Sequence, residues 1–115
     1  MRVLVAVDRT DLSISTLKMF LETQAKITHE VIVLYLSEEP SKATERRRES
    51  LINEQNVEGS NLLTKAMETK THAKSTEVIF GQTKLSNHPE MLGEIIEIIE
   101  ERSVELVVIG INFEH

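Results

Sequence analysis

Four short, mostly apolar runs divide the chain, and between them apolar residues recur every three or four positions. The short runs are rich in Val, Ile and Leu, which is typical of strands buried on both faces of a parallel sheet. The intervening spacing is that of amphipathic helices. We predict strands at residues 2–7, 31–36, 75–80 and 104–109. This alternation predicts a three-layer α/β/α fold with a four-stranded parallel sheet between the helices.

The first two helices differ in polarity. Residues 11–26 carry apolar side chains at helical spacing, and we expect one amphipathic helix there. Residues 40–72 are mostly polar, and Pro40 suits a first helical position. Gly59 separates two apolar clusters in this segment, and glycine weakens a helix interior. We therefore expect a second helix that is either long or interrupted at Gly59, and that packs mainly through its second half.

The third helix has the clearest limits in the sequence. Pro89 suits its first turn, and Asn87 or His88 can cap it. We expect the polar residues 82–88 before it to form a loop. Its apolar stripe consists of Leu92, Ile95, Ile96 and Ile99.

The length of 115 residues suits one domain with a real core, and we expect a single domain over residues 1–115. The chain has no cysteine, which excludes disulfides and thiolate metal sites. It shows neither a signal peptide nor an apolar run of the roughly 18–20 residues that a membrane helix needs. We therefore expect a cytoplasmic protein that does not associate with membranes.

Acidic residues outnumber basic ones by 19 to 13, and the formal net charge is −6. This balance argues against binding to the phosphate backbone of DNA or RNA. Seventeen of the acids are Glu, which favours solvated helix faces, so that Asp8 and Asp11 stand out. The basic triplet Arg46–Arg48 is compatible with a phosphate-binding patch, but the Glu residues that flank it favour a charged helix face.

The sequence lacks the common catalytic and metal-binding patterns. Its four Gly are scattered, so neither a G-x-G-x-x-G fingerprint nor a P-loop occurs. No Ser lies in a G-x-S-x-G elbow. No Asp follows Asp11, although a phosphate-accepting receiver domain would require one. The four His are not spaced as metal ligands, and we interpret each as a surface residue. We therefore expect no catalytic residue and no metal site, and we do not predict an enzyme.

The carboxyl ends of the first, second and fourth strands are the expected ligand-binding edge, because ligands of such sheets bind near the switch in strand order. Residues 7–9, 35–37 and 109–111 lie there. Asp8 follows a buried apolar run and has two possible roles. Its carboxylate can cap the turn into the next helix, or it can contact a ligand. Its position favours ligand contact.

The order of these segments resembles the universal stress protein family over nearly the whole chain. Val3–Asp8 and then Arg9–Ser13 are similar to the family's opening, a strand that ends in Val-Asp before a polar turn and a helix. Glu30–Leu36 is similar to its second strand. Gly81 and Ser103–Gly110 are similar to the glycine after its third strand and to its fourth strand. The resemblance implies an adenine-nucleotide alpha-hydrolase-like fold with strand order 3-2-1-4.

The resemblance also implies a ligand. In ATP-binding members of the family, the Asp after the first strand and the end of the second strand contact adenine and ribose. A glycine-rich loop after the fourth strand holds the phosphates. ATP or AMP is therefore the implied cofactor. The implied adenosine-binding residues are Ala6, Val7, Asp8, Leu36, Ile109 and Gly110.

The family's phosphate-binding loop and fifth strand have no counterpart in the sequence. Phe113 stands at the position of the loop's second glycine, and Glu114 adds a negative charge there. We therefore expect at most weak binding of adenine nucleotides. Arg9 replaces a frequent glycine, and it either faces solvent or contacts an anionic ligand.

Two functions remain open. The resemblance implies a regulatory stress-response protein with a small nucleotide-like ligand. The alternative is an interaction module of the same fold that binds no nucleotide and acts through oligomerisation. In strand order 3-2-1-4, the apolar residues Leu106–Ile109 form an edge strand, so we expect a homodimer or larger oligomer. A sequence that continues past His115 would cover that edge instead.

Overall fold

The computed structural model describes residues 1–40, 44–84 and 87–111. All strands of this part belong to one parallel sheet with the order β3-β2-β1-β4. The predicted parallel sheet and its strand order are therefore confirmed. The strands are β1 (Arg2–Val7), β2 (Glu30–Glu38), β3 (Ser75–Thr83) and β4 (Leu106–Ile109).

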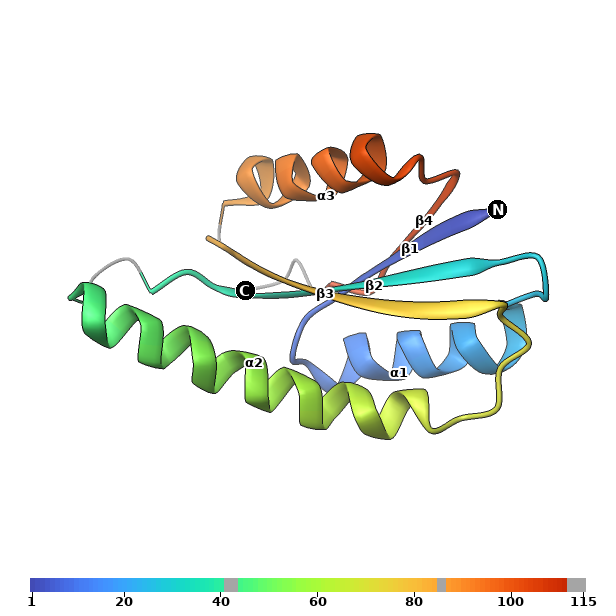
Figure 1. The fold of residues 1–115 in the computed structure, drawn as a ribbon, viewed down its shortest axis with the longest axis horizontal. Helices are drawn as coiled ribbons and strands as arrows, with labels where there is room; N and C mark the ends of the chain where they lie inside the picture. Colours follow the sequence, from blue (N-terminus) through green and yellow to red (C-terminus); the bar gives the residue numbers. More distant parts are fainter. Residues whose placement is uncertain (41–43, 85–86, 112–115) are drawn as a thin grey trace.

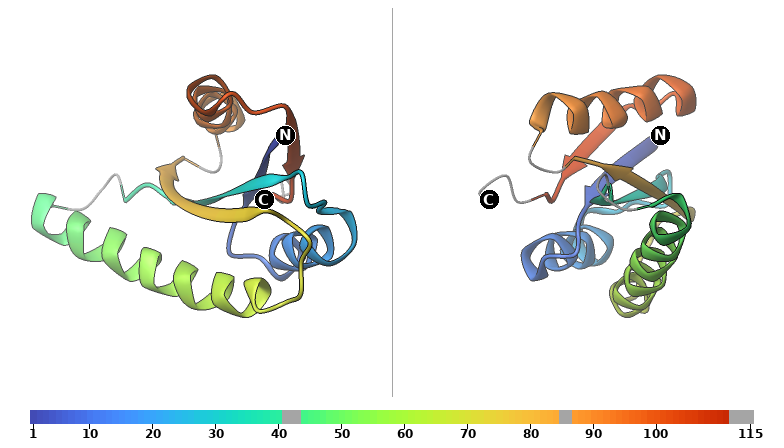
Figure 2. Two further views of the ribbon diagram at one scale, coloured as in Figure 1. Left: turned by 45° about the vertical axis from the view of Figure 1, so that its right-hand side comes forward. Right: turned by 90° about the vertical axis from the view of Figure 1, so that its left-hand side faces the viewer.

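Helices cover both faces of this sheet (Figure 1). On one face lie α1 (Asp11–Met19), its continuation η1 (Phe20–Gln24) and α2 (Glu45–Met67). On the other face lies α3 (His88–Arg102). The two turned views in Figure 2 show the same layers. The predicted three-layer α/β/α fold is confirmed.

The sheet has a core on each face, because successive residues of a strand point to opposite sides. The core toward α1 and α2 includes Val3, Val5, Val7, Val33, Tyr35, Leu17 and Leu63. The core toward α3 includes Leu4, Ala6, Leu34, Leu36, Met91 and Ile95. Burial on both faces explains why the central strands β1 and β2 are continuous apolar runs.

The second helix takes one of its two predicted forms. α2 is uninterrupted over Glu45–Met67, so the long helix is confirmed and the interruption at Gly59 is wrong. Gly59 is buried against β2, where a Cβ would stand 2.7 Å from Cε1 of Tyr35. Packing on the sheet outweighs the low helix propensity of glycine. The predicted start at Pro40 is also wrong, because Thr44 is the N-cap and its Oγ1 accepts from the backbone N–H of Arg47 at 3.4 Å.

The third strand is longer than its apolar residues indicated. Gln82 and Thr83, predicted as loop, are the last residues of β3 and lie opposite Ser37 and Glu38 of β2. Pairing with a neighbouring strand that also extends past its apolar run explains this polar end. The predicted loop residues 85–86 lie outside the described residues.

The first helix ends earlier than predicted, and one histidine is buried. α1 stops at Met19, and the wider turn η1 follows, closed by the N–H of Ala25 on the carbonyl of Phe20 at 2.9 Å. His29, interpreted as a surface residue, is buried after this turn. Its Nδ1 accepts from the N–H of Lys26 at 3.1 Å, and its ring stacks on Phe20. Stacking on Phe20 of this turn accounts for the burial of His29, which the local polarity of the sequence did not indicate.

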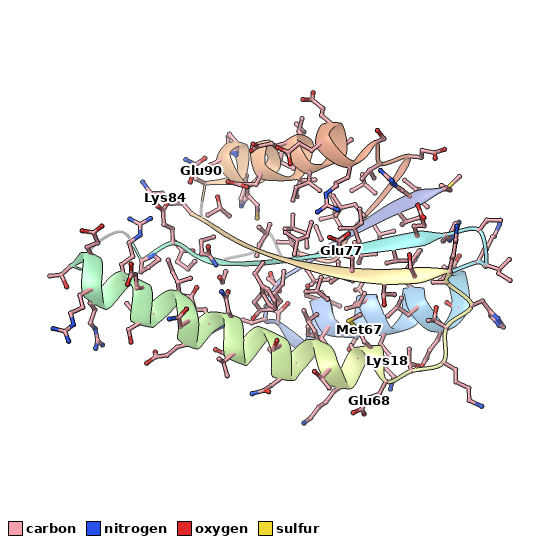
Figure 3. The ribbon with its side chains drawn as sticks, in the orientation of Figure 1. Lys18, Met67, Glu68, Glu77, Lys84 and Glu90 are labelled. Carbon is pink, nitrogen blue, oxygen red and sulfur yellow. The ribbon has the colours of Figure 1, made fainter. Side chains whose placement is uncertain are left out.

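The predicted start of the third helix is confirmed. Asn87 caps α3 by accepting from the N–H of Glu90 at 3.2 Å. Figure 3 shows Glu90 beside Lys84, whose backbone N–H lies 3.5 Å from Oε1 of Glu90. At its other end, α3 is joined to β3 by the ion pair of Arg102 with Glu77 at 2.9 Å.

Candidate ligand-binding site

A small cavity lies at the carboxyl ends of β1 and β2, beside α2. Its volume is about 140 Å³. It lies at the sheet edge predicted from the sequence, where ligands of parallel sheets bind. We call it the Asp8 pocket. It is lined by Asp8, Arg9, Thr10, Tyr35, Leu36, Ser37, Glu38, Gln55 and Glu58.

Asp8 is 2% exposed and holds the turn between β1 and α1. Its Oδ1 accepts from the backbone N–H of Thr10 at 2.9 Å and from Oγ1 of Thr10 at 2.6 Å. Its own N–H donates to Oγ of Ser13 at 2.7 Å. Thr10 in turn caps α1, because its Oγ1 accepts from the N–H of Ser13 at 3.3 Å. The carboxylate therefore holds the turn and also forms part of the pocket wall.

Tyr35 forms the β2 side of the pocket and is surrounded by charge. Burial raises the pKa of its phenol, and the carboxylate of Glu58 raises it further. Arg9 lowers this pKa and Asp8 raises it, by smaller amounts. The ring meets Phe80 edge-on, with centroids 5.9 Å apart. Tyr35 is therefore a neutral, fixed wall between charged side chains.

α2 contributes two lining residues that were not predicted from the sequence, Gln55 and Glu58. Oε1 of Gln55 is buried and has no hydrogen-bond partner among the described residues. Buried polar atoms are nearly always hydrogen-bonded, so this acceptor is unusual. One sequence feature points to it. Gln55 follows Ile52 by three residues and precedes Gly59 by four, so it stands on the helix stripe that faces the sheet.

The structure brings two of the six predicted adenosine-binding residues, Asp8 and Leu36, into the pocket wall. Ala6 is fully buried in β1, and so is Val7 on the opposite face of the sheet.

The last two predicted residues lie on the far side of β1 from the pocket. Ile109 pairs with Ala6, and the N–H of Gly110 donates to the carbonyl of Ala6 at 2.8 Å. Gly110 also lies against α1, where a Cβ would stand 3.2 Å from Cβ of Thr16. Ala6, Val7, Ile109 and Gly110 are therefore not among the residues that line the pocket.

The charged residues singled out in the sequence have different surroundings. Arg9 is exposed and lines the pocket. Arg48, from the basic triplet, forms an ion pair with Glu39 at 2.5 Å, so its charge is matched within the chain. Phe113 and Glu114 lie outside the described residues.

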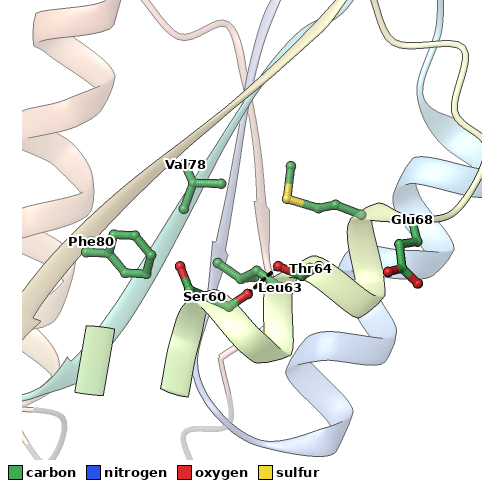
Figure 4. A pocket seen from close by; sticks show the side chains of 7 residues that line it. Ser60, Leu63, Thr64, Glu68, Val78 and Phe80 are labelled. Atoms are coloured by element: carbon green, nitrogen blue, oxygen red, sulfur yellow. Dashed lines mark hydrogen bonds between the residues drawn. The ribbon is translucent and has the colours of Figure 1, made fainter. Parts of the chain in front are cut away.

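A larger hollow lies away from the strand ends, between α2 and β3 (Figure 4). Its volume is about 370 Å³, and Leu63, Val78 and Phe80 give it an apolar lining. The rim includes Thr64, whose hydroxyl donates to the carbonyl of Ser60 at 2.7 Å. This hydroxyl is thus used within the helix, and the Asp8 pocket has the richer set of polar groups.

Residues 1–40, 44–84 and 87–111 contain neither a metal centre nor a membrane span. Within these ranges, no three His, Asp or Glu side chains gather as metal ligands would. No helix in the same ranges combines the length and the hydropathy that a membrane span requires.

Comparison with known proteins identifies the family. The model of the universal stress protein family matches residues 1–112, and the chain therefore belongs to that family. A search of curated proteins gives no significant match.

Solved structures show the same fold at low sequence identity. The universal stress protein UspA from Lactobacillus plantarum is 12% identical with a TM-score of 0.66, over 95% of this chain and 75% of that one. The hypothetical protein PH0823 is 19% identical with a TM-score of 0.64, over 92% and 70% of the two chains. Protein Rv1636 from Mycobacterium tuberculosis is 15% identical with a TM-score of 0.62, over 95% and 69%.

Proposed function

We propose that this universal stress protein is a regulatory stress-response protein that binds an adenine nucleotide weakly in the Asp8 pocket. Family membership supports the stress-response role. One observation carries the ligand site: Asp8 and Leu36 line a single cavity at the adjacent ends of β1 and β2. Parallel α/β sheets bind ligands at this edge.

The donors and acceptors of the pocket fit the adenosine part of such a ligand. The buried Oε1 of Gln55 suits the amino group of a base, and carboxylates such as that of Asp8 suit ribose hydroxyls. In this proposal Ala6, Val7, Ile109 and Gly110 shape the site through the strand ends that they form. The cavity is smaller than the roughly 300–1,000 Å³ of typical ligand pockets, which supports weak binding.

Isothermal titration calorimetry with AMP and ATP tests the proposal. We expect dissociation constants above the micromolar range, and loss of binding in Asp8→Asn, which replaces one of the carboxylate oxygens that suit ribose hydroxyls by an amide NH2 group. Asp11→Asn is the matched control, because Asp11 is an exposed residue in the first turn of α1. Submicromolar binding of ATP would refute weak binding. Undiminished binding by Asp8→Asn would show that the nucleotide binds outside this pocket.

A second candidate function is supported by the edge strand β4. β4 lies at the end of the sheet and pairs only with β1 among the described strands. Its apolar residues Leu106 and Ile109 are 42% and 43% exposed. An apolar edge strand invites pairing with another chain. The alternative proposal is a homo-oligomeric interaction module that associates through β4.

Light scattering distinguishes this alternative. We expect a dimer or larger oligomer at micromolar concentration and a monomer for Leu106→Lys. Ile27→Lys is the control, because Ile27 is exposed in the loop before β2. A stable wild-type monomer would contradict association through β4.

A further inference from the structure

We propose that the Asp8 pocket selects an uncharged ligand rich in hydrogen-bond donors, of the nucleoside type, over the corresponding nucleotide. Gln55 and Glu58 of α2 are its specificity-determining residues. This inference rests on the proposed function, since it takes adenine compounds as the ligand class and ranks them.

The first argument is charge. The lining contains three carboxylates, those of Asp8, Glu38 and Glu58, and one guanidinium, that of Arg9. Tyr35 between them is neutral. A phosphate ester would bring one or two further negative charges to this acidic wall, where like charges repel strongly once water is displaced. A nucleoside carries no charge and meets no such repulsion.

The second argument is hydrogen bonding. Oε1 of Gln55 is a buried acceptor without a partner among the described residues, and Gln55 is one of the residues that line the pocket. An acceptor in that position is satisfied only by a donor, such as an exocyclic amine. A site built around such a group discriminates strongly against a ligand that lacks the matching donor. Gln55 therefore favours an amino-substituted base.

The third argument is position. Gln55 and Glu58 lie about one turn apart on α2, and both line the pocket opposite the strand ends. In this proposal the buried amide oxygen of Gln55 is the group that binds the base. Glu58 is exposed and lines the pocket, so in this proposal its carboxylate repels a charged substituent that reaches toward solvent. α2 thus contributes both Gln55, which attracts the base, and Glu58, which repels the phosphate.

The test compares adenosine and AMP by titration calorimetry at low salt. We expect wild-type protein to bind adenosine at least about tenfold more tightly than AMP. Glu58→Gln is expected to raise the affinity for AMP about three- to tenfold and to change that for adenosine less. Glu54→Gln is the matched control, one turn earlier on the exposed face of α2 and outside the pocket lining, and it is expected to change neither. Raising the salt from about 20 to about 300 mM is expected to strengthen AMP binding relative to adenosine.

Gln55→Met tests the hydrogen bond, because it keeps the length of the side chain and removes the acceptor. We expect adenosine affinity to fall about tenfold or more, while the unfolding temperature of the ligand-free protein does not fall. Asn53→Met, on the exposed face of α2, is expected to leave the affinity unchanged. The Glu58→Gln titration decides the charge argument even where Gln55→Met folds poorly.

The outcomes separate this inference from the proposed function. AMP binding as tight as or tighter than adenosine, lost in Asp8→Asn, would overturn the inference and leave the proposed function intact. Equal adenosine affinity of Gln55→Met and wild type would show that Gln55 does not recognise the base. Absence of binding by both compounds would overturn both proposals.

Discussion

The ring of Tyr35 occupies the space that a side chain at position 59 would need. A Cβ on Gly59 would stand 2.7 Å from Cε1 of Tyr35, closer than two carbon atoms approach in proteins. The glycine thus lets α2 lie directly on β2. Because Tyr35 also lines the Asp8 pocket, this contact sets where α2 places Gln55 and Glu58.

Gly59→Ala is expected to destabilise the protein by about 1–3 kcal/mol, because the added methyl group overpacks the contact with Tyr35. Urea unfolding followed by circular dichroism measures the change. Gly93→Ala is the control: Gly93 lies inside α3, and a Cβ added there would have no atom within 4 Å. At that position the same substitution is expected to stabilise the helix by about 0.5–1 kcal/mol. Equal effects at the two positions would contradict the packing explanation.

The parallel sheet was predictable because burial on two faces is visible in the two central strands, β1 and β2. Val3–Val7 and Val31–Leu36 are continuous apolar runs, and such runs have few other interpretations in a chain of this length. The errors arose where tertiary packing decides. Gly59 weakens an isolated helix, which left an interruption open, but it fits a helix that lies against an aromatic ring. Gln82 and Thr83 have no strand pattern of their own and are held by their neighbours in β2.

The site was predictable only from the strands. Asp8, Tyr35 and Leu36 follow from the rule that ligands bind at the carboxyl ends of parallel strands. Gln55 and Glu58 lie on a polar helix, where the sequence offers many similar residues. Which of these reaches the pocket depends on the rotation and position of α2, and those are set by its packing on the sheet.

Alkaline titration tests the environment of the pocket, because Tyr35 is the single tyrosine and the chain has no tryptophan. Burial and Glu58 raise the pKa of the phenol, so its absorbance is expected to change at a pH above the ordinary value of about 10. Glu58→Gln is expected to lower this midpoint, and Glu54→Gln to leave it unchanged. A midpoint at or below the ordinary value would contradict the arrangement of Tyr35 and Glu58.

The same shift links Tyr35 to stability. Its folded pKa lies above its unfolded pKa, so ionisation favours the unfolded chain. Stability is therefore expected to fall as the pH rises from the ordinary tyrosine pKa through the raised one. Tyr35→Phe is expected to lessen this fall, which urea unfolding at several alkaline pH values measures.

Glu94 on α3 is expected to oppose folding near neutral pH. Burial raises the pKa of its carboxyl, and the carboxylates of Glu97, Glu90 and Glu39 raise it further. The folded state thus favours the protonated form, and this contribution is lost as the pH rises from the ordinary pKa of about 4.3 through the raised value. Glu94→Gln is expected to raise the melting temperature at about pH 7 but not at about pH 3.5.

Added salt should reduce the effect of Glu94→Gln, because the side chain is partly exposed and its neighbours are screened. Glu54→Gln on α2 serves as the control for removing a surface charge. A greater stabilisation at the acidic pH than at the neutral pH would contradict the charge cluster on α3.

Neighbouring amides on α2 give the last prediction, because one is satisfied and the other is not. Oδ1 of Asn56 accepts from Nε2 of Gln82 at 3.3 Å, whereas Oε1 of Gln55 is buried without a partner among the described residues. Removing a side chain that makes a hydrogen bond loses that bond and leaves its partner unsatisfied. Removing a buried acceptor that makes no hydrogen bond relieves the cost of its desolvation. Asn56→Leu is therefore expected to destabilise the ligand-free protein by about 0.5–1.5 kcal/mol, and Gln55→Met to stabilise it by about 1 kcal/mol. Urea unfolding without ligand measures both variants, and destabilisation by Gln55→Met would show that this amide serves the fold instead of a ligand.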